Sequence, residues 1–139
     1  MKRILVDTNV VLDVLLNREP HVGASAAVWQ AIETGGVEGL LSAHAIPTIH
    51  YLIRKERGGS VARRTLGEIL RVFLVAAVDG SVIQHALESP CPDFEDSVSA
   101  AAARLAGCDV IVTRDPKGFP SSPVRVLSPE AVAPLLRKI

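Results

Sequence analysis

The sequence has few cysteines, few aromatic residues and no long hydrophobic run. Cys91 and Cys108 are the only cysteines among 139 residues, and a chain of this length can bury an adequate core without disulfides. We therefore expect two reduced core thiols in a cytoplasmic protein. No apolar run approaches the roughly 20 residues of a membrane span. The early carboxylate of Asp7 leaves too little room for a signal-peptide core, so no membrane association is predicted.

The sequence also lacks an excess of either charge, with 15 Lys plus Arg and 15 Asp plus Glu. Net charge therefore indicates no partner, and a nucleic-acid-binding protein would need its basic residues gathered locally. The densest basic cluster consists of Arg54, Lys55, Arg57, Arg63 and Arg64. Such a cluster is typical of a solvated helical hairpin, and its alternative interpretation is a patch that follows the phosphates of RNA.

What the sequence does have is a hydrophobic content of 48%, dominated by Val, Leu, Ile and Ala. This composition suits helices layered on a buried parallel sheet. Apolar runs predict strands at 3–6, 37–41, 74–78, 109–113 and 124–127. Helical spacing and breakers predict helices at 7–16, before Gly35, at 42–57, from Ser60 to 73, at 81–88, 93–106 and 129–137. The alternation predicts a single three-layer α/β/α domain over residues 1–139, with a mostly parallel sheet of four to five strands.

Carboxylates occur at positions that a parallel sheet would bring to one edge. Asp7 directly follows the first predicted strand, and Asp115 follows the fourth. Asp93, Glu95 and Asp96 occupy the first turn of the helix before that fourth strand. Ligands of such sheets bind beyond the carboxyl ends of the strands, where the strand order reverses. We therefore expect these acidic side chains to share one pocket.

Crowded carboxylates repel one another and tend to keep their protons unless a cation is present. Mg²⁺ and Mn²⁺ prefer carboxylate and water oxygens. A bound cation of this kind also activates water and stabilises the negative charge that develops in phosphodiester hydrolysis. Each acid taken singly could be a helix cap, but their shared edge favours a metal site.

Within the acidic turn, Asp96 is expected to lean inward because it precedes the apolar stripe that starts at Val98 by only two residues. Asp93 lies three residues earlier on the same face and suits a cap. Glu95 points about 100° away from Asp96 and could assist from the side. We therefore predict that Asp7, Asp96 and Asp115 bind the metal and carry catalysis, with Glu95 as an additional ligand.

Three segments together resemble the PIN domain family, the metal-dependent ribonucleases that include the VapC toxins of toxin–antitoxin pairs. They are Leu-Val-Asp-Thr-Asn-Val-Val-Leu at 5–12, Asp-Phe-Glu-Asp-Ser-Val at 93–98, and the run at 109–119 that contains Thr-Arg-Asp. The resemblance covers nearly the whole chain. It implies a Mg²⁺- or Mn²⁺-dependent endoribonuclease that cuts RNA, a homodimer, and an antitoxin protein as partner.

The resemblance also implies roles for individual residues. Asp7 is similar to the family's first metal ligand, Asp96 to the acid that opens the penultimate core helix, and Asp115 to the acid after the fourth strand. Asn9 and Thr113 match polar residues that orient those ligands.

One position departs from the family pattern. PIN nucleases usually carry a Glu in the helix after the second strand, and the matching place near Thr48 has no carboxylate. Glu95 or Asp93 would then supply the missing charge.

Other polar residues carry weaker functional interpretations. His44 and His50 are six residues apart, on nearly opposite helix faces, so we expect no shared metal site; His50 would pack beside the site or contact substrate. Lys117 flanks Asp115 and could touch a phosphate. Trp29 is expected in the core or at an oligomer interface.

Two alternative functions remain open. A phosphatase of the haloacid-dehalogenase type also begins with a strand followed by Asp, but it normally needs a second acid where this chain has Asn9. The absent Glu also permits an inactive PIN-like scaffold that binds RNA or a protein without cutting.

Overall fold

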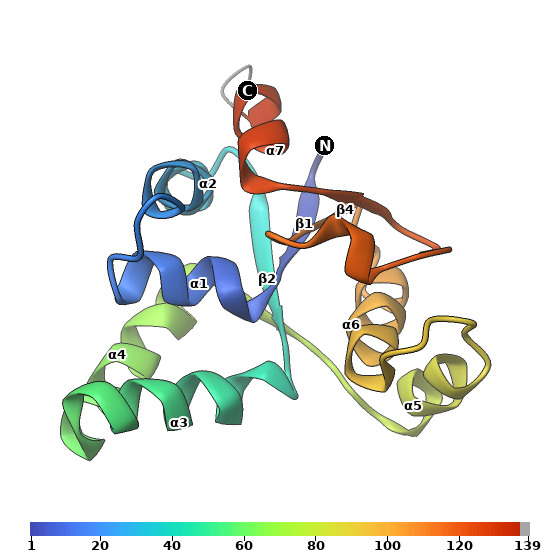
Figure 1. The fold of residues 1–139 in the computed structure, drawn as a ribbon, viewed down its shortest axis with the longest axis horizontal. Helices are drawn as coiled ribbons and strands as arrows, with labels where there is room; N and C mark the ends of the chain where they lie inside the picture. Colours follow the sequence, from blue (N-terminus) through green and yellow to red (C-terminus); the bar gives the residue numbers. More distant parts are fainter. Residues whose placement is uncertain (137–139) are drawn as a thin grey trace.

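The computed structural model describes residues 1–136 (Figure 1). Its strands are β1 (Arg3–Val6), β2 (Glu38–Ser42), β3 (Leu74–Ala76), β4 (Val110–Val112) and β5 (Arg125–Leu127). Its helices are α1 (Thr8–Leu15), α2 (Val22–Glu33), α3 (Ala45–Arg57), α4 (Gly59–Val72), α5 (Gly80–Leu87), α6 (Phe94–Leu105), the 3₁₀ helix η1 (Pro116–Gly118) and α7 (Pro129–Leu136). The predicted α/β class is confirmed, and the predicted four to five strands number five.

The strands form one sheet in the order β3-β2-β1-β4-β5, and every neighbouring pair is parallel. The chain first builds outward from β1 through β2 to β3, and then returns to add β4 on the other side of β1. The strand order therefore reverses between β1 and β4, which is where sheets of this kind bind ligands.

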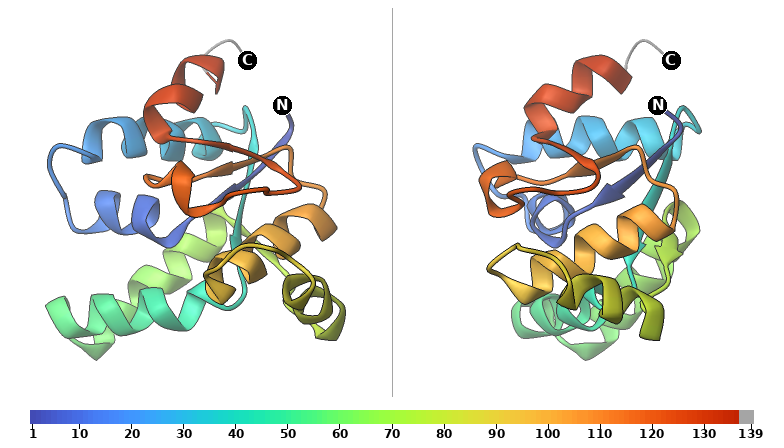
Figure 2. Two further views of the ribbon diagram at one scale, coloured as in Figure 1. Left: turned by 45° about the vertical axis from the view of Figure 1, so that its right-hand side comes forward. Right: turned by 90° about the vertical axis from the view of Figure 1, so that its right-hand side faces the viewer.

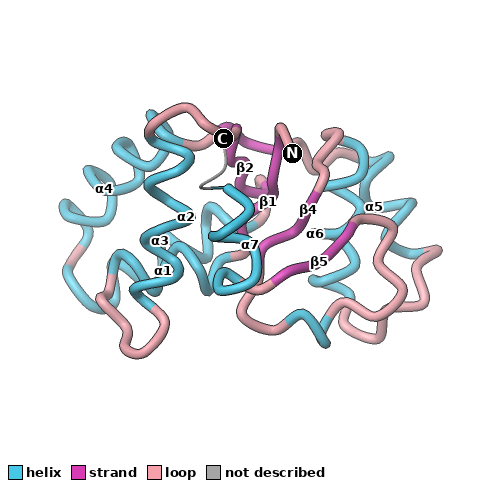
Figure 3. Tube along the Cα trace, turned by 90° about the horizontal axis from the view of Figure 1, so that it is seen from above, coloured by secondary structure: helices cyan, strands magenta, loops and turns pink. Residues whose placement is uncertain are grey.

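Helices cover both faces of the sheet, as the views in Figures 2 and 3 show. The strand residues alternate between two buried clusters, as the pleat requires. Ile4, Val6 and Val112 join the cluster that contains buried residues of α1–α4 and α7. Leu5 and Ile111 join the second cluster, with α5 and α6. The result is the predicted three-layer arrangement.

Several predicted helix boundaries were wrong for local reasons. Ser42 does not start a helix: it is the last residue of β2, where it pairs with Ala76. Ser60 does not cap α4, because Gly58, two residues earlier, adopts a φ of 91° and is the N-cap of the helix. That positive φ is a conformation that glycine adopts without a side-chain clash.

Three other expectations have mixed outcomes. Both cysteines are free, but only Cys108 is buried, whereas Cys91 is partly exposed. Trp29 packs against the core and meets Phe73 edge to face, with ring centroids 5.0 Å apart. The predicted end of the last helix at Arg137 lies outside the described residues.

Across residues 1–136 no helix combines the length and apolar character needed to cross a membrane.

Candidate functional site

The candidate site lies where β1 and β4 end side by side. Asp7 follows β1 and Thr113 follows β4, and the backbone N–H of Asp7 donates to the Val112 carbonyl at 2.9 Å. This bond continues the pairing of the two strands by one step, so the side chains beyond it are held in register. We call this place the acidic edge, defined by Asp7, Asp96 and Asp115.

Asp7 is the most constrained of the three carboxylates. Its Oδ1 accepts from the Thr8 backbone N–H at 2.9 Å, which makes Asp7 the N-cap of α1. Its Oδ2 accepts from the Thr113 hydroxyl at 2.8 Å and from the Asn9 amide at 3.3 Å. Burial raises the pKa of Asp7, and the Thr113 hydrogen bond opposes that shift. Capping and a functional role are thus compatible in this residue.

A set of linked hydrogen bonds orders the loop after β4. The Thr113 hydroxyl that donates to Asp7 also accepts from the Asp115 backbone N–H at 3.2 Å. The Arg114 backbone N–H donates to Asn9 Oδ1 at a longer 3.4 Å. Asn9 and Thr113 therefore make the contacts that orienting residues would make. The carboxylate of Asp115 makes no capping hydrogen bond to η1, and the residue is exposed.

Asp96 and Asp115 converge on Gly118. A Cβ added to Gly118 would lie 3.1 Å from Asp115 Oδ2 and 3.4 Å from Asp96 Oδ2. The two carboxylates therefore come from different elements and flank one small space. Burial, followed by the negative charges of Asp93, Asp7, Glu95 and Asp115, raises the pKa of Asp96 to about 6. Such a shift marks a site that lacks compensating positive charge.

The other two acids of this turn take different places. Asp93 is the N-cap of α6, and its Oδ1 accepts from the Asp96 backbone N–H at 3.1 Å. Glu95 is exposed, yet its charge acts on both Asp96 and His44. Asp93 thus has the position expected of a cap, and Glu95 lies beside the acidic edge.

His44 is the neighbour of the site that the sequence reasoning missed. It precedes α3 just beyond β2, and its Nδ1 makes a hydrogen bond with the Ser42 hydroxyl. Its Nε2 lies 3.5 Å from the Ser99 hydroxyl of α6. Burial lowers the pKa of His44, while the charges of Glu95 and Asp7 act in the opposite direction. The placement of His44 after a strand end is the signal that could have found it, because it also located Asp7.

The carboxylate that is absent near Thr48 has no replacement on α3 at the edge. Thr48 itself is exposed on α3. The basic residues Arg54, Lys55 and Arg57 lie in the last part of α3, away from its start next to His44. Lys117 is exposed in η1 beside Asp115.

The donor atoms of this edge suit a divalent metal, but the protein side chains do not surround an ion on all sides. The side chains offer oxygen donors with excess negative charge, which suits Mg²⁺ or Mn²⁺. Among residues 1–136, no group of three or more His, Cys, Asp or Glu side chains is close enough to enclose an ion. Mg²⁺ commonly keeps several waters and uses only one or two carboxylates together with substrate phosphates. The acidic edge matches that open kind of site.

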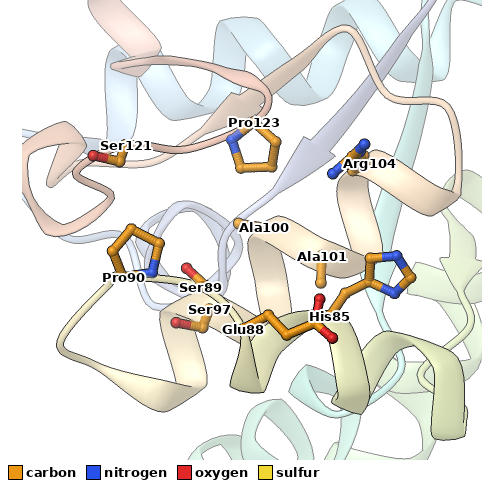
Figure 4. Close-up of a pocket in the computed structure, with 10 residues that line it drawn as sticks. All are labelled: His85, Glu88, Ser89, Pro90, Ser97, Ala100, Ala101, Arg104, Ser121 and Pro123. Carbon is orange, nitrogen blue, oxygen red and sulfur yellow. The ribbon is translucent and has the colours of Figure 1, made fainter.

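A separate pocket of about 270 Å³ lies between α5, α6 and the loop before β5 (Figure 4). Its polar lining includes His85 and Glu88 of α5 and Arg104 of α6. None of the three residues of the acidic edge lines it, so it does not belong to the candidate site.

Comparison with known proteins identifies the family. The profile of the PIN domain matches residues 3–117. The chain belongs to the PIN domain family. A comparison with curated proteins gives no match. The acidic edge described above is therefore the candidate active site of a PIN domain.

Solved structures with the same fold include three bacterial PIN-like chains. A chain of FitAcB from Neisseria gonorrhoeae has a TM-score of 0.71 at 22% identity, over 91% of this chain and 98% of that one. A toxin–antitoxin complex from Klebsiella pneumoniae gives 0.69 at 19%, over 91% and 97%. VapC20 from Mycobacterium tuberculosis, a sarcin–ricin loop cleaving toxin, gives 0.62 at 20%, over 78% and 86%. At these identities the likeness shows a shared fold.

Proposed function

We propose that this PIN domain is a Mg²⁺- or Mn²⁺-dependent endoribonuclease, and the toxin of a toxin–antitoxin pair. The observation that carries the proposal is the convergence of Asp96 and Asp115 on Gly118, beside the held carboxylate of Asp7. The raised pKa of Asp96 supports it, because burial and, after it, the neighbouring negative charges disfavour the carboxylate, and a cation would offset both effects. Likeness to a loop-cleaving toxin and to a toxin–antitoxin complex favours RNA and an antitoxin as partners.

In this proposal Asp7, Asp96 and Asp115 supply the carboxylates of the metal site, directly or through bound water, and Glu95 assists from its exposed position. When bound, the ion supplies positive charge and an activated water for attack on phosphorus. Thr113 and Asn9 keep Asp7 oriented through their hydrogen bonds to Oδ2. Asp93 holds the start of α6, and so fixes where Asp96 lies.

The direct test measures cleavage of a labelled RNA in Mn²⁺ or Mg²⁺ by the wild type and by Asp7→Asn. We expect cleavage by the wild type, loss of more than 99% of it in Asp7→Asn, and loss in EDTA, since removing a residue that acts as part of a catalytic unit costs orders of magnitude. Asp109→Asn is the matched control, because Asp109 binds the backbone of Lys2 and Arg3 at the opposite end of the sheet. Equal cleavage by wild type and Asp7→Asn would refute the assignment.

A second candidate is an inactive PIN scaffold that binds RNA or a protein without cutting. The open arrangement of the carboxylates and the exposed Thr48 favour it. Calorimetric titration with Mn²⁺ separates the two: the nuclease proposal expects binding that Asp7→Asn weakens, and the scaffold expects no binding at millimolar Mn²⁺. Sedimentation of the purified protein tests the homodimer that the family resemblance implies.

A further inference from the structure

The helical hairpin of α3 and α4 carries a cavity lined by two arginines. It measures about 430 Å³ and is lined by His50, Arg54, Gly59, Ser60 and Arg63. Among residues 1–136, ion pairs with carboxylates occur at Arg3 and Arg114, so the guanidinium groups of Arg54 and Arg63 are not neutralised in this way. Two such groups, brought to one cavity by different helices, favour an anion such as phosphate.

A second cavity of about 530 Å³ adjoins the first, because His50 and Arg63 line both. Its remaining lining is mostly apolar: Ile46, Pro47, Leu66, Gly67 and Leu70. We call the two cavities together the α3–α4 groove. One part of it offers positive charge and the other offers apolar surface. A single-stranded nucleic acid presents both matching features, a charged backbone and flat apolar base faces.

The groove begins beside the acidic edge and leads away from it. Ile46 lies in the first turn of α3, and α3 starts just beyond the carboxyl end of β2, the strand that pairs with β1 ahead of Asp7. Arg54 follows ten residues after His44, about 15 Å farther along a helix. Figure 1 shows α3 running from the end of β2 to its turn with α4. A single strand of nucleic acid that lies in the groove would thus have one end at the acidic edge.

We infer that the α3–α4 groove binds single-stranded RNA, with Arg54 and Arg63 holding backbone phosphates several nucleotides from the scissile bond. This inference rests on the proposed ribonuclease function and adds the surface that delivers the substrate. It also answers an electrostatic problem, since the acidic edge alone repels a polyanion. Of the five basic residues in the cluster, the groove selects two, and leaves Lys55, Arg57 and Arg64 outside its lining.

That selection allows a charge-matched test. Binding of a labelled single-stranded RNA is measured by fluorescence anisotropy in EDTA, in an Asp7→Asn background, at several salt concentrations. The groove variant is Arg54→Gln/Arg63→Gln, and the control is Arg57→Gln/Arg64→Gln, which removes the same charge from the same two helices. We expect Kd to rise about tenfold or more in the groove variant, with its salt slope smaller by about 1.4, the value for two lost phosphate contacts to a single strand. In the control we expect less than a threefold change.

Three outcomes overturn the inference. Equal losses of RNA affinity in both variants indicate that RNA responds to the overall positive charge of the hairpin and not to the groove. Unchanged binding in both indicates another RNA surface. Unchanged RNA binding with altered sedimentation of the groove variant indicates a protein interface. Circular dichroism and a thermal melt of each variant exclude unfolding as the cause of any loss.

Cleavage separates this inference from the proposed function. A dinucleotide is too short to reach from the acidic edge to Arg54, so its cleavage in Mn²⁺ should be the same in Arg54→Gln/Arg63→Gln and wild type, while cleavage of a longer RNA falls. If RNA binding maps to the groove and the wild type cuts nothing, the groove stands and the nuclease proposal fails. If the groove variant cuts long RNA as well as wild type at subsaturating concentration, the groove inference fails and the nuclease proposal stands.

Discussion

Replacing either partner of the ion pair between Asp13 and Arg114 should carry very different costs. Asp13 Oδ2 lies 2.9 Å from Arg114 Nε, and the two side chains are 0% and 28% exposed. The Ser25 hydroxyl donates to the same oxygen at 3.2 Å. Asp13 Oδ1 has no partner, and the Arg114 Nε–H is not well aligned with the carboxylate. The contact is therefore a buried ion pair that joins α1 and α2 to the loop after β4.

The magnitudes follow from which charge is left behind. Arg114→Gln leaves the fully buried carboxylate of Asp13 without a countercharge, and removing one partner of a buried pair typically costs about 3–5 kcal/mol. Asp13→Asn leaves a cation that already reaches water and can rotate further outward, so we expect a cost of about 1–2 kcal/mol. The double variant should cost less than the sum of the singles by about 2 kcal/mol, because it removes both charges together.

Urea unfolding of the four proteins at pH 7 measures these free energies. Glu38→Gln is the control, because its pair with Arg3 is exposed and should change stability by less than about 1 kcal/mol. Additive single effects, or a cost for Arg114→Gln no larger than that for Asp13→Asn, would refute the reasoning. We also expect Arg114→Gln to weaken Mn²⁺ binding, because the loop that carries Thr113 and Asp115 loses its ion pair with α1.

Three further predictions concern the acidic edge. Thr113→Val should weaken Mn²⁺ binding about 10- to 100-fold in calorimetry, because the 2.8 Å hydrogen bond to Asp7 is lost; Thr113→Ser should retain most of the affinity. The folded-state pKa of Asp96 is raised from 3.8 to about 6, so without metal the wild type should lose stability as pH rises through this window. Asp96→Asn should then be more stable than wild type by about 1 kcal/mol at pH 7.5, after allowance for solvent screening, and a gain that persists in urea melts at pH 3.5 would contradict this cause. Gly118→Ala should weaken Mn²⁺ binding about tenfold in calorimetry with little change in melting temperature, since its methyl group would lie 3.1 Å from Asp115 Oδ2; unchanged affinity would show that the space beside Gly118 is not used.

Strands and helices could be predicted where one physical signal dominated. The run at 3–6 is apolar and short, and β1 has the predicted bounds. The predictions at Ser42 and Ser60 were wrong because the helix-capping tendency of serine competes there with another structural signal. Ser42 is a good helix cap in isolation, but its pairing with β3 keeps it in the strand. At the start of α4, the positive φ of Gly58 overrides the capping tendency of Ser60.

The acidic edge was predictable because topology converts sequence position into spatial position. A residue shortly after a parallel strand lies at the carboxyl edge of the sheet, and this rule places Asp7 and Asp115 without any coordinates. The same rule does not reach the buried pair of Asp13 and Arg114, which are about a hundred positions apart. Asp13 lies among apolar residues in the second half of α1, and one sequence alone gives no sign of its partner.

The missing carboxylate near Thr48 affects how strongly the metal and the RNA depend on each other for binding. That position offers no carboxylate, so the edge carries fewer negative charges than the family pattern implies. Fewer ligands weaken metal binding on its own, and a Mg²⁺ ion that keeps one or two carboxylates draws its remaining oxygens from water and substrate phosphate. Under the proposed function, RNA held by Arg54 and Arg63 would complete the metal site, and the metal would in turn tighten the RNA. Because coupling between two ligands is reciprocal, each should raise the affinity of the other by the same factor, which an edge with a full carboxylate set would not need.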